Sequence, residues 1–111
     1  MISSKRNELV NILKVLDAKY KAAERGFAMA EQKRRNCQIE IAAVNIQIKS
    51  ASNLSESDTI SIRSFCDWRR KLIDDLARLK SLERDLAAES ARRRKILEDA
   101  MRQKISVEAL I

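Results

Sequence analysis

Apolar residues recur at alternating spacings of four and three through the first half of the chain, and no other feature constrains the fold as strongly. A repeat of 3.5 residues that persists beyond three or four heptads is typical of a helix in a coiled coil. We therefore predict one long helix from about residue 4 to about residue 51, with Ser3 and Ser4 as candidate N-caps. The seam consists of Leu9, Leu13, Leu16, Tyr20, Ala23, Phe27, Ala30, Arg34, Cys37, Ile41, Val44, Ile48 and Ala51, in which only Arg34 is not apolar in character.

The second half repeats this pattern less regularly. Leu82 forms a stripe parallel to the main register, which suggests that the seam drifts or stutters there. Because polar interruptions accumulate toward the C-terminus, we expect the end that holds both termini to be looser and more basic than the other end. Apolar residues in the register are Ile62, Phe65, Leu72, Leu76, Leu79, Leu86, Leu97, Ala100 and Val107, and polar ones are Arg69, Glu83, Ser90, Arg93 and Lys104.

A polar segment of about residues 52–58 separates the two halves. It is rich in Ser, Asn and Asp, whose side chains compete for backbone hydrogen bonds and favour turns and caps. Ser57 or Asp58 is a candidate cap for a second helix over about residues 59–109. The chain has no proline, and its one glycine, Gly26, lies inside the first helix, where we expect a close approach of the partner helix.

Two arms of nearly equal length joined by a short loop fold back on each other. The sequence therefore predicts an all-α fold in which two long helices form a single antiparallel coiled-coil hairpin over residues 1–111.

Several classes of function are disfavoured by what the sequence lacks. It has no histidine, and Cys37 and Cys66, both expected to be buried thiols, stand in no metal-binding spacing. Phosphate-binding and nucleophile-elbow motifs are absent, and a two-helix rod offers no interior for convergent catalytic groups. We expect a non-enzymatic protein without cofactor or metal. The opening residues lack the apolar core of a secretory signal and no apolar run would span a membrane, so we expect a cytoplasmic location.

The net charge of +7 raises nucleic acid, anionic membrane and acidic protein as partners. Basic runs occur at residues 33–35 and 92–95, but acidic residues flank both and no aromatic residue is interleaved. Docking onto an acidic protein surface therefore fits better than nucleic-acid binding. We see no strong apolar face outside the seam that would lie on a membrane, and we predict no direct membrane insertion.

The stretch from Ile60 to Leu79 holds the only tryptophan. Packing near the loop explains Phe65 and Leu72, whereas Trp68 lies beside the best register. An exposed aromatic residue next to a seam is a typical interface anchor, so we favour a binding role for Trp68.

The pattern resembles the FliJ-type proteins of bacterial flagellar export and the YscO-type proteins of type III secretion injectisomes. The resemblance begins with LVNILKVLDAKYKAAE and continues in EQKRRNCQIEI, with its basic pair followed by Cys-Gln. The second helix opens with Phe65-x-x-Trp68-x-x-x-Leu72, and the charged tail RRKILEDAMRQKISVEAL closes the match.

This resemblance implies a two-helix coiled coil similar to the central stalk of rotary ATPases. Such a stalk binds a hexameric export ATPase, an export gate that is a membrane protein, and escort chaperones, and it is peripheral to the inner-membrane export apparatus. The ATPase-binding part would include Arg92, Arg93 and Arg94. The gate-binding surface would comprise Trp68, Leu72, Asp75, Leu79, Ala43 and Gln47. The residues alone leave two other classes open: a generic coiled-coil scaffold or adaptor, with self-association possible, and a nucleic-acid-binding accessory rod.

Overall fold

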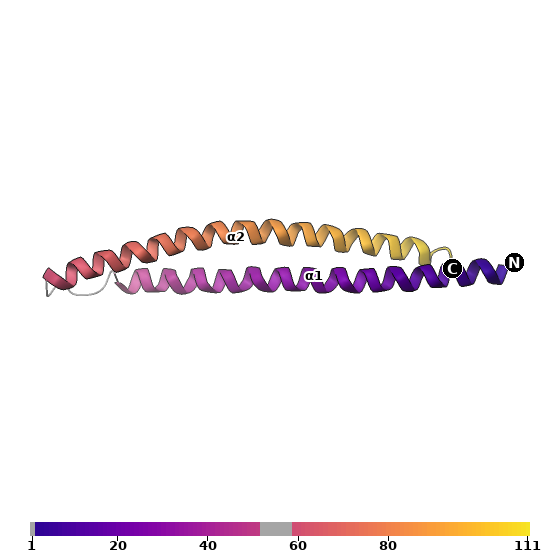
Figure 1. The fold of residues 1–111 in the computed structure, drawn as a ribbon, viewed down its shortest axis with the longest axis horizontal. Coiled ribbons are helices and arrows are strands. Elements are labelled where there is room, and N and C mark those ends of the chain that lie inside the picture. Colours follow the sequence, from indigo (N-terminus) through magenta and orange to yellow (C-terminus); the bar gives the residue numbers. More distant parts are fainter. Residues whose placement is uncertain (1, 52–58) are drawn as a thin grey trace. The chain divides into compact units, whose positions relative to one another are not determined.

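The chain forms two helices in the computed structural model, which describes residues 2–51 and 59–111 (Figure 1). Helix α1 spans Ile2–Ala51 and helix α2 spans Thr59–Glu108. Both lie within about two residues of the predicted bounds. The predicted loop over residues 52–58, with its candidate caps Ser57 and Asp58, lies outside the described residues. The prediction that Ser3 and Ser4 cap the first helix is wrong, because α1 already includes both.

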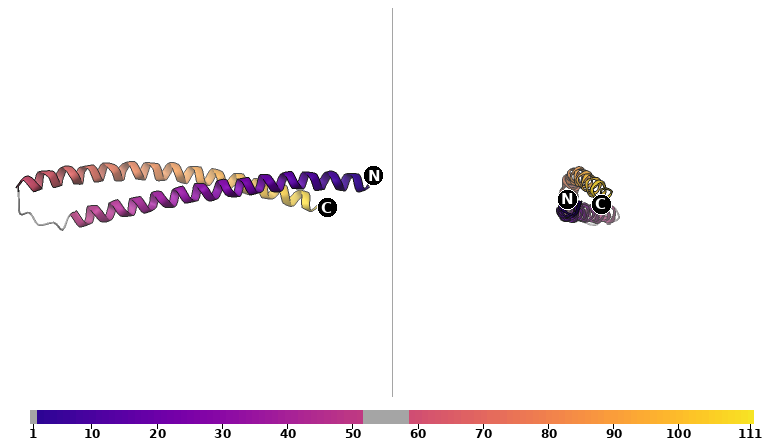
Figure 2. Two further views of the ribbon diagram at one scale, coloured as in Figure 1. Left: turned by 60° about the horizontal axis from the view of Figure 1, so that its bottom comes forward. Right: turned by 90° about the vertical axis from the view of Figure 1, so that its right-hand side faces the viewer.

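The contacts between the helices divide the chain into two compact units. The terminal unit comprises Met1–Gln32 and Ala88–Ile111, and the central unit comprises Lys33–Ala87. Within each unit, a segment of α1 runs antiparallel to a segment of α2, as the colours in Figures 1 and 2 show. The predicted all-α, antiparallel coiled-coil hairpin is therefore confirmed.

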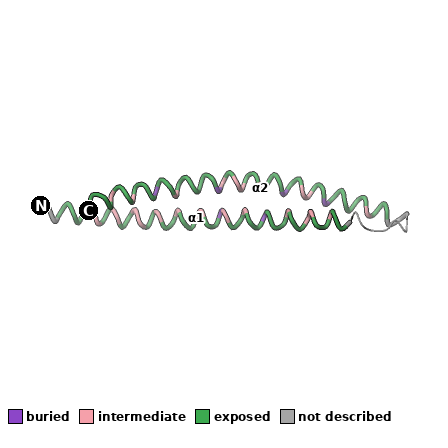
Figure 3. Tube along the Cα trace, turned by 180° about the vertical axis from the view of Figure 1, so that it is seen from behind, coloured by how far each residue is buried: buried purple, intermediate pink, exposed green. Residues whose placement is uncertain are grey.

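The predicted seam of α1 is confirmed wherever its side chains are described. Every seam residue from Leu9 to Ile48 is buried or half-buried, and most of its neighbours are exposed. Figure 3 shows this alternation along both helices. Full burial is rare, because two helices can cover a side chain from only a few directions. The buried apolar residues of the described chain are Ala30, Cys37, Leu72, Leu79 and Ala100.

The seam of α2 is confirmed for most of its apolar residues but not for Ile62, which is 42% exposed. The predicted drift at Leu82 is wrong: Leu82 is exposed, and the next residue, Glu83, keeps the seam position and is half-buried. Arg69 and Arg93 occupy seam positions but are exposed. Their long side chains reach solvent from a position where a shorter polar group would stay covered.

The terminal unit is neither loosely packed at its polar seam positions nor distinctly more basic. Ser90 is only 3% exposed and Ala100 only 1% exposed. The unit has twelve basic and eight acidic residues, a net of +4, and the central unit has eleven and eight, a net of +3. The predicted looseness is not seen at Ser90 or Ala100, and the predicted excess of positive charge amounts to one unit of charge.

Gly26 is not explained by a close approach of the α2 backbone. A Cβ atom added there would have only side-chain atoms of Arg93 within 4 Å, with Nη1 at 3.5 Å and Cδ at 3.8 Å. These are ordinary van der Waals distances to a flexible side chain. The space at Gly26 therefore admits an alanine.

We predict that Gly26→Ala raises the free energy of unfolding by about 1 kcal/mol, because alanine is the better helix former and meets no clash. Urea denaturation followed by circular dichroism measures the change. The matched control is Ala28→Gly at an exposed position of the same unit, which should lower stability by a similar amount. A loss of stability in Gly26→Ala would mean that Arg93 cannot move away from the added methyl group.

Candidate functional site

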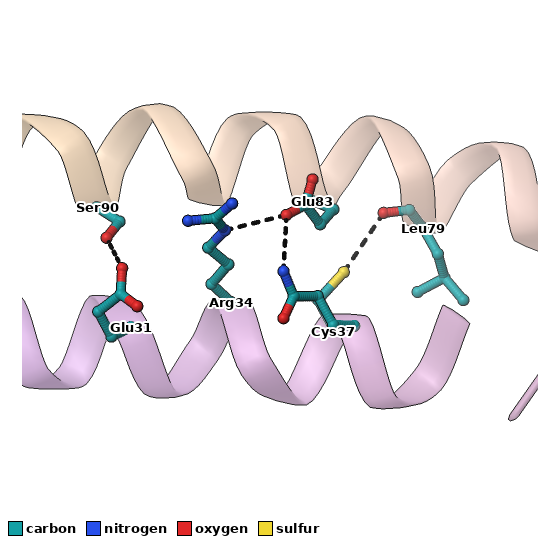
Figure 4. Close-up of polar contacts among 7 residues, drawn as sticks. Glu31, Arg34, Cys37, Leu79, Glu83 and Ser90 are labelled. Carbon is teal, nitrogen blue, oxygen red and sulfur yellow. Dashed lines mark hydrogen bonds and ion pairs between the residues drawn. The ribbon is translucent and has the colours of Figure 1, made fainter. Parts of the chain in front are cut away.

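The central unit contains a polar cluster within its apolar seam (Figure 4). The Nε atom of Arg34 donates a hydrogen bond to Oε1 of Glu83 at 3.0 Å. The amide of Gln38 donates to the same oxygen at 3.3 Å. The hydrogen bond from Arg34, and to a smaller extent that from Gln38, lowers the pKa of the Glu83 carboxyl. Glu83 is thus held as a carboxylate between α1 and α2.

Cys37 is buried beside this cluster, 4% exposed, and its thiol donates to the Leu79 carbonyl oxygen at 3.4 Å. Burial is the main cause that raises the pKa of the Cys37 thiol, and the negative charges of Glu40 and Glu83 raise this pKa further. A protonated thiol is a poor nucleophile. The predicted burial is confirmed for Cys37 and wrong for Cys66, which is exposed because its position lies beside the seam.

The terminal unit has polar contacts of its own across the helices, among them a hydrogen bond from the ammonium of Lys19 to Oε1 of Gln103 at 3.0 Å. Ser90 donates to the carboxylate of Glu31 (Figure 4). The ammonium of Lys104 lies 2.9 Å from Oδ1 of Asp17 and 5.2 Å from the centre of the Tyr20 ring. The hydrogen bond between Lys104 and Asp17 lowers the pKa of Asp17 and raises the pKa of Lys104.

A shallow depression of about 310 Å³ lies next to this ion pair. Asp17 and Lys104 face it, and they already neutralise each other. Its lining consists of Val10, Leu13, Lys14, Asp17, Lys104 and Glu108.

The six residues assigned by resemblance to a gate-binding surface all belong to the central unit but differ in accessibility. Leu72 and Leu79 are 8% and 9% exposed and pack in the hairpin's own seam. Asp75 is half-buried and pairs with Arg78 at 3.2 Å. A partner therefore cannot reach the two leucines without opening the hairpin.

Three members of that surface are exposed: Trp68, Ala43 and Gln47. The Trp68 side chain is 42% exposed, and its ring centre lies 6.2 Å from that of Phe65 with the planes tilted by 49°. Phe65 is half-buried and supports the indole from one side. Trp68 thus combines a ring contact within the hairpin with an exposed surface, as interface anchors do.

Arg92, Arg93 and Arg94 are all exposed in the terminal unit, and each pairs with a carboxylate on its own helix. Arg92 and Arg93 both contact Glu89, and Arg94 lies 3.5 Å from Glu98. Exposed ion pairs of this kind contribute between zero and about 1 kcal/mol each. The three guanidinium groups can therefore exchange these partners for the carboxylates of another protein at small cost.

Arg34 and Glu83 appear in the sequence as separate interruptions of the two seams, and aligning the two arms in antiparallel order brings the two positions together. Ile39 and Ile46, which the seam pattern does not single out, are 66% and 63% exposed on the side of α1 opposite the seam. Their spacing of seven residues is the available signal.

Comparison with protein-family models, with curated proteins and with solved structures finds no match for this chain. Among the described residues, neither helix contains a stretch long and apolar enough to cross a membrane. The same part of the chain holds no group of three or more potential metal ligands. Inference about function therefore rests on the surfaces described above.

We predict that Glu83→Gln lowers the midpoint of thermal unfolding at neutral pH and that this difference shrinks in acid. The pKa of Glu83 is lowered in the folded protein from its usual value of 4.5, so the carboxylate contributes stability above that value. The contribution is lost as the pH falls through the folded pKa. Circular dichroism melts from pH 7 to about pH 3 measure it.

The control for this prediction is Asp85→Asn, which removes an exposed carboxylate from the same unit. It should shift the midpoint little at either pH, because exposed single charges contribute little. A Glu83→Gln protein that retains the full acid dependence of the wild type would contradict the assignment.

Proposed function

We propose that this chain is a non-enzymatic stalk or coupling component of a bacterial flagellar or type III protein export ATPase. In this role it binds the ATPase ring, the export gate and escort chaperones. The observation that carries the proposal is the antiparallel pairing of two 50-residue helices through one narrow seam. That arrangement is expected of the stalk family that the sequence resembles.

The terminal unit supplies the surface for the ATPase. Arg92, Arg93 and Arg94 present positive charge from three successive positions of α2, and their present partners are weakly held. A ring lined by carboxylates would replace these partners with stronger, less solvated pairs. As a stiff rod, the coiled coil would then transmit conformational differences between the subunits of the ring.

The central unit supplies the surface for the gate. The exposed part of Trp68 can bury its large apolar area in a partner while its ring keeps the contact with Phe65. Ala43 and Gln47 are exposed on the neighbouring surface of α1, which is therefore accessible to a partner. Leu72 and Leu79 contribute by fixing α2 in place.

We predict that replacing Arg92, Arg93 and Arg94 by Gln reduces recovery of the export ATPase by ten-fold or more, an order-of-magnitude expectation for three charge-assisted contacts. The measurement is a pull-down of the tagged chain from a lysate of its own organism, quantified by mass spectrometry. Glutamine keeps helix propensity, so circular dichroism should not change.

The matched control for that pull-down replaces Lys14, Lys21 and Arg25, three exposed cations of α1 in the same unit, by Gln. It loses the same charge and should retain most of the ATPase. The proposal would be contradicted if the wild-type chain did not recover a secretion-type ATPase. Equal losses in the two variants would show that only net charge matters.

We also predict that Trp68→Ala spares helicity and lowers recovery of the gate protein by about thirty-fold, because hot-spot aromatic residues contribute about 2 kcal/mol or more. Recovery of the ATPase should not change. Ile46→Ala, which truncates an exposed apolar residue on the opposite side of α1, serves as the control. A marked loss of helicity in Trp68→Ala would instead assign the indole to packing within the hairpin.

A generic scaffold is the second candidate, and the exposed Ile39 and Ile46 favour it. The two residues lie one heptad apart on the back of α1 and could bury their side chains in a further helix. This reading predicts concentration-dependent self-association in analytical ultracentrifugation that Ile39→Ser abolishes. Recovery of the export ATPase distinguishes the stalk from the scaffold.

A further inference from the structure

The seam divides the remaining surface of the central unit into two broad faces. In heptad notation, seam residues occupy positions a and d, with Ile41 and Leu76 at a and Cys37 and Leu79 at d. Positions b and e lie to one side of the seam of each helix, and positions c and g lie to the other. In an antiparallel pair the e positions of the two helices are neighbours. The b and e residues of both helices therefore share one face.

That face of the central unit, which we call the basic face, carries positive charge only. All six of its charged residues are cationic and exposed, and no acidic residue occupies a described b or e position of this unit. Five of the six occupy b positions, at the outer margins of the face. The six residues are Arg35, Lys49, Arg63, Arg70, Lys80 and Arg84.

The opposite face of the same unit has no such excess. Its c and g positions hold three cations and three anions, a net charge of zero. These are Lys33, Lys71, Arg78, Glu40, Asp75 and Asp85.

The b and e positions of the terminal unit are mixed in sign as well, with three cations and five anions. The cations are Lys14, Lys21 and Arg94, and the anions are Asp17, Glu24, Glu31, Glu98 and Glu108. The separation of charge is thus particular to one face of one unit.

Aliphatic side chains lie among the cations of the basic face. Ile73, at an e position, is 46% exposed, and Ile62, at the seam edge, is 42% exposed. Cys66 lies between them at another exposed e position. Exposed isoleucines within a positively charged surface can add apolar contact with acyl chains to the electrostatic attraction between cations and anionic headgroups.

We propose that the basic face of the central unit binds the surface of an anionic lipid bilayer, which replaces the expectation from the sequence that no face outside the seam would lie on a membrane. A plane contacts both helices at once, so it reaches the b positions at the outer margins of the face as well as the e positions in its middle. A single acidic helix docked between α1 and α2 would reach mainly the e positions, where only Lys80 is charged. A second copy of the same face would be repelled by like charge.

Nucleic acid fits this face less well. The phosphate backbone would satisfy the cations but would leave Ile62 and Ile73 without apolar contact. Single-stranded nucleic acid is bound by aromatic stacking, and Trp68, the exposed aromatic residue of the described chain, occupies a g position on the opposite face. The proposal goes beyond the stalk function and holds whether or not the chain binds an ATPase.

The test compares two variants with the same loss of charge in the same unit. Arg63, Arg70 and Arg84 of the basic face are replaced by Gln in one, and Lys33, Lys71 and Arg78 of the opposite face in the other. All six side chains are exposed, so both proteins should keep the wild-type circular dichroism spectrum. Binding is measured by co-sedimentation with phosphatidylcholine vesicles that do or do not contain phosphatidylglycerol.

We expect the wild type to bind only the vesicles that contain phosphatidylglycerol. Each basic residue at an anionic surface strengthens binding about five-fold, so the basic-face variant should bind about a hundred-fold more weakly. The opposite-face variant should stay within a few-fold of the wild type. Ile73→Ser, which leaves every charge in place, should bind the vesicles measurably more weakly than the wild type does.

Three outcomes would overturn the proposal. One is a wild-type chain that does not sediment with the phosphatidylglycerol vesicles. Another is an equal loss in the two triple variants, which would reduce the effect to net charge. The last is tighter binding to duplex or single-stranded DNA than to vesicles, lost in the basic-face variant and unchanged in Ile73→Ser, which would assign the face to nucleic acid.

Discussion

Apolar contact along one narrow seam holds α1 against α2, and the other properties of the molecule depend on it. Long helices in water gain most of their stability from packing an apolar face rather than from helix propensity. Here that packing covers few residues completely: Ala30 and Ala100 in the terminal unit, and Cys37, Leu72 and Leu79 in the central unit. Because so little is fully buried, each polar residue in the seam has to find a partner there or reach solvent.

The polar interruptions meet this requirement by pairing with residues of the other helix. Glu83 accepts hydrogen bonds from Arg34 and Gln38 in the central unit, and Lys104 contacts Asp17 and Tyr20 in the terminal unit. Such pairs add little stability compared with an apolar seam, because the ions must be desolvated. They do specify alignment, since shifting one helix against the other would leave the charges unpaired. We infer that they set the antiparallel register, as single polar residues do in other coiled coils.

The seam also decides which side chains remain for binding. Leu72 and Leu79 are used in the hairpin itself, whereas Trp68, one position outside the seam, keeps a free face supported by Phe65. On the terminal unit, Arg92, Arg93 and Arg94 are exposed and only locally paired. The central unit adds a face whose charged residues are all cationic. Protein partners and an anionic surface would thus be served by different faces of the same seam.

The sequence by itself determined the helices, their approximate bounds and the seam of α1, because a 3.5-residue repeat is a local property that neighbouring side chains impose directly. It also showed that Trp68 lies beside the register. The tertiary structure alone decided how the interruptions pair, that Glu83 rather than Leu82 stays in the seam, and that Cys66 and Ile62 are exposed while Ser90 is buried. It likewise showed that Arg93, not the backbone of α2, lies over Gly26. The basic face depends on both: the heptad register places Arg63, Arg70 and Arg84 on one side of α2 and Arg35 and Lys49 on one side of α1, and the antiparallel pairing brings these two sides together. The exposure of a side chain at a flanking position depends on the residues of the opposing helix, and the repeat within one helix does not identify those residues.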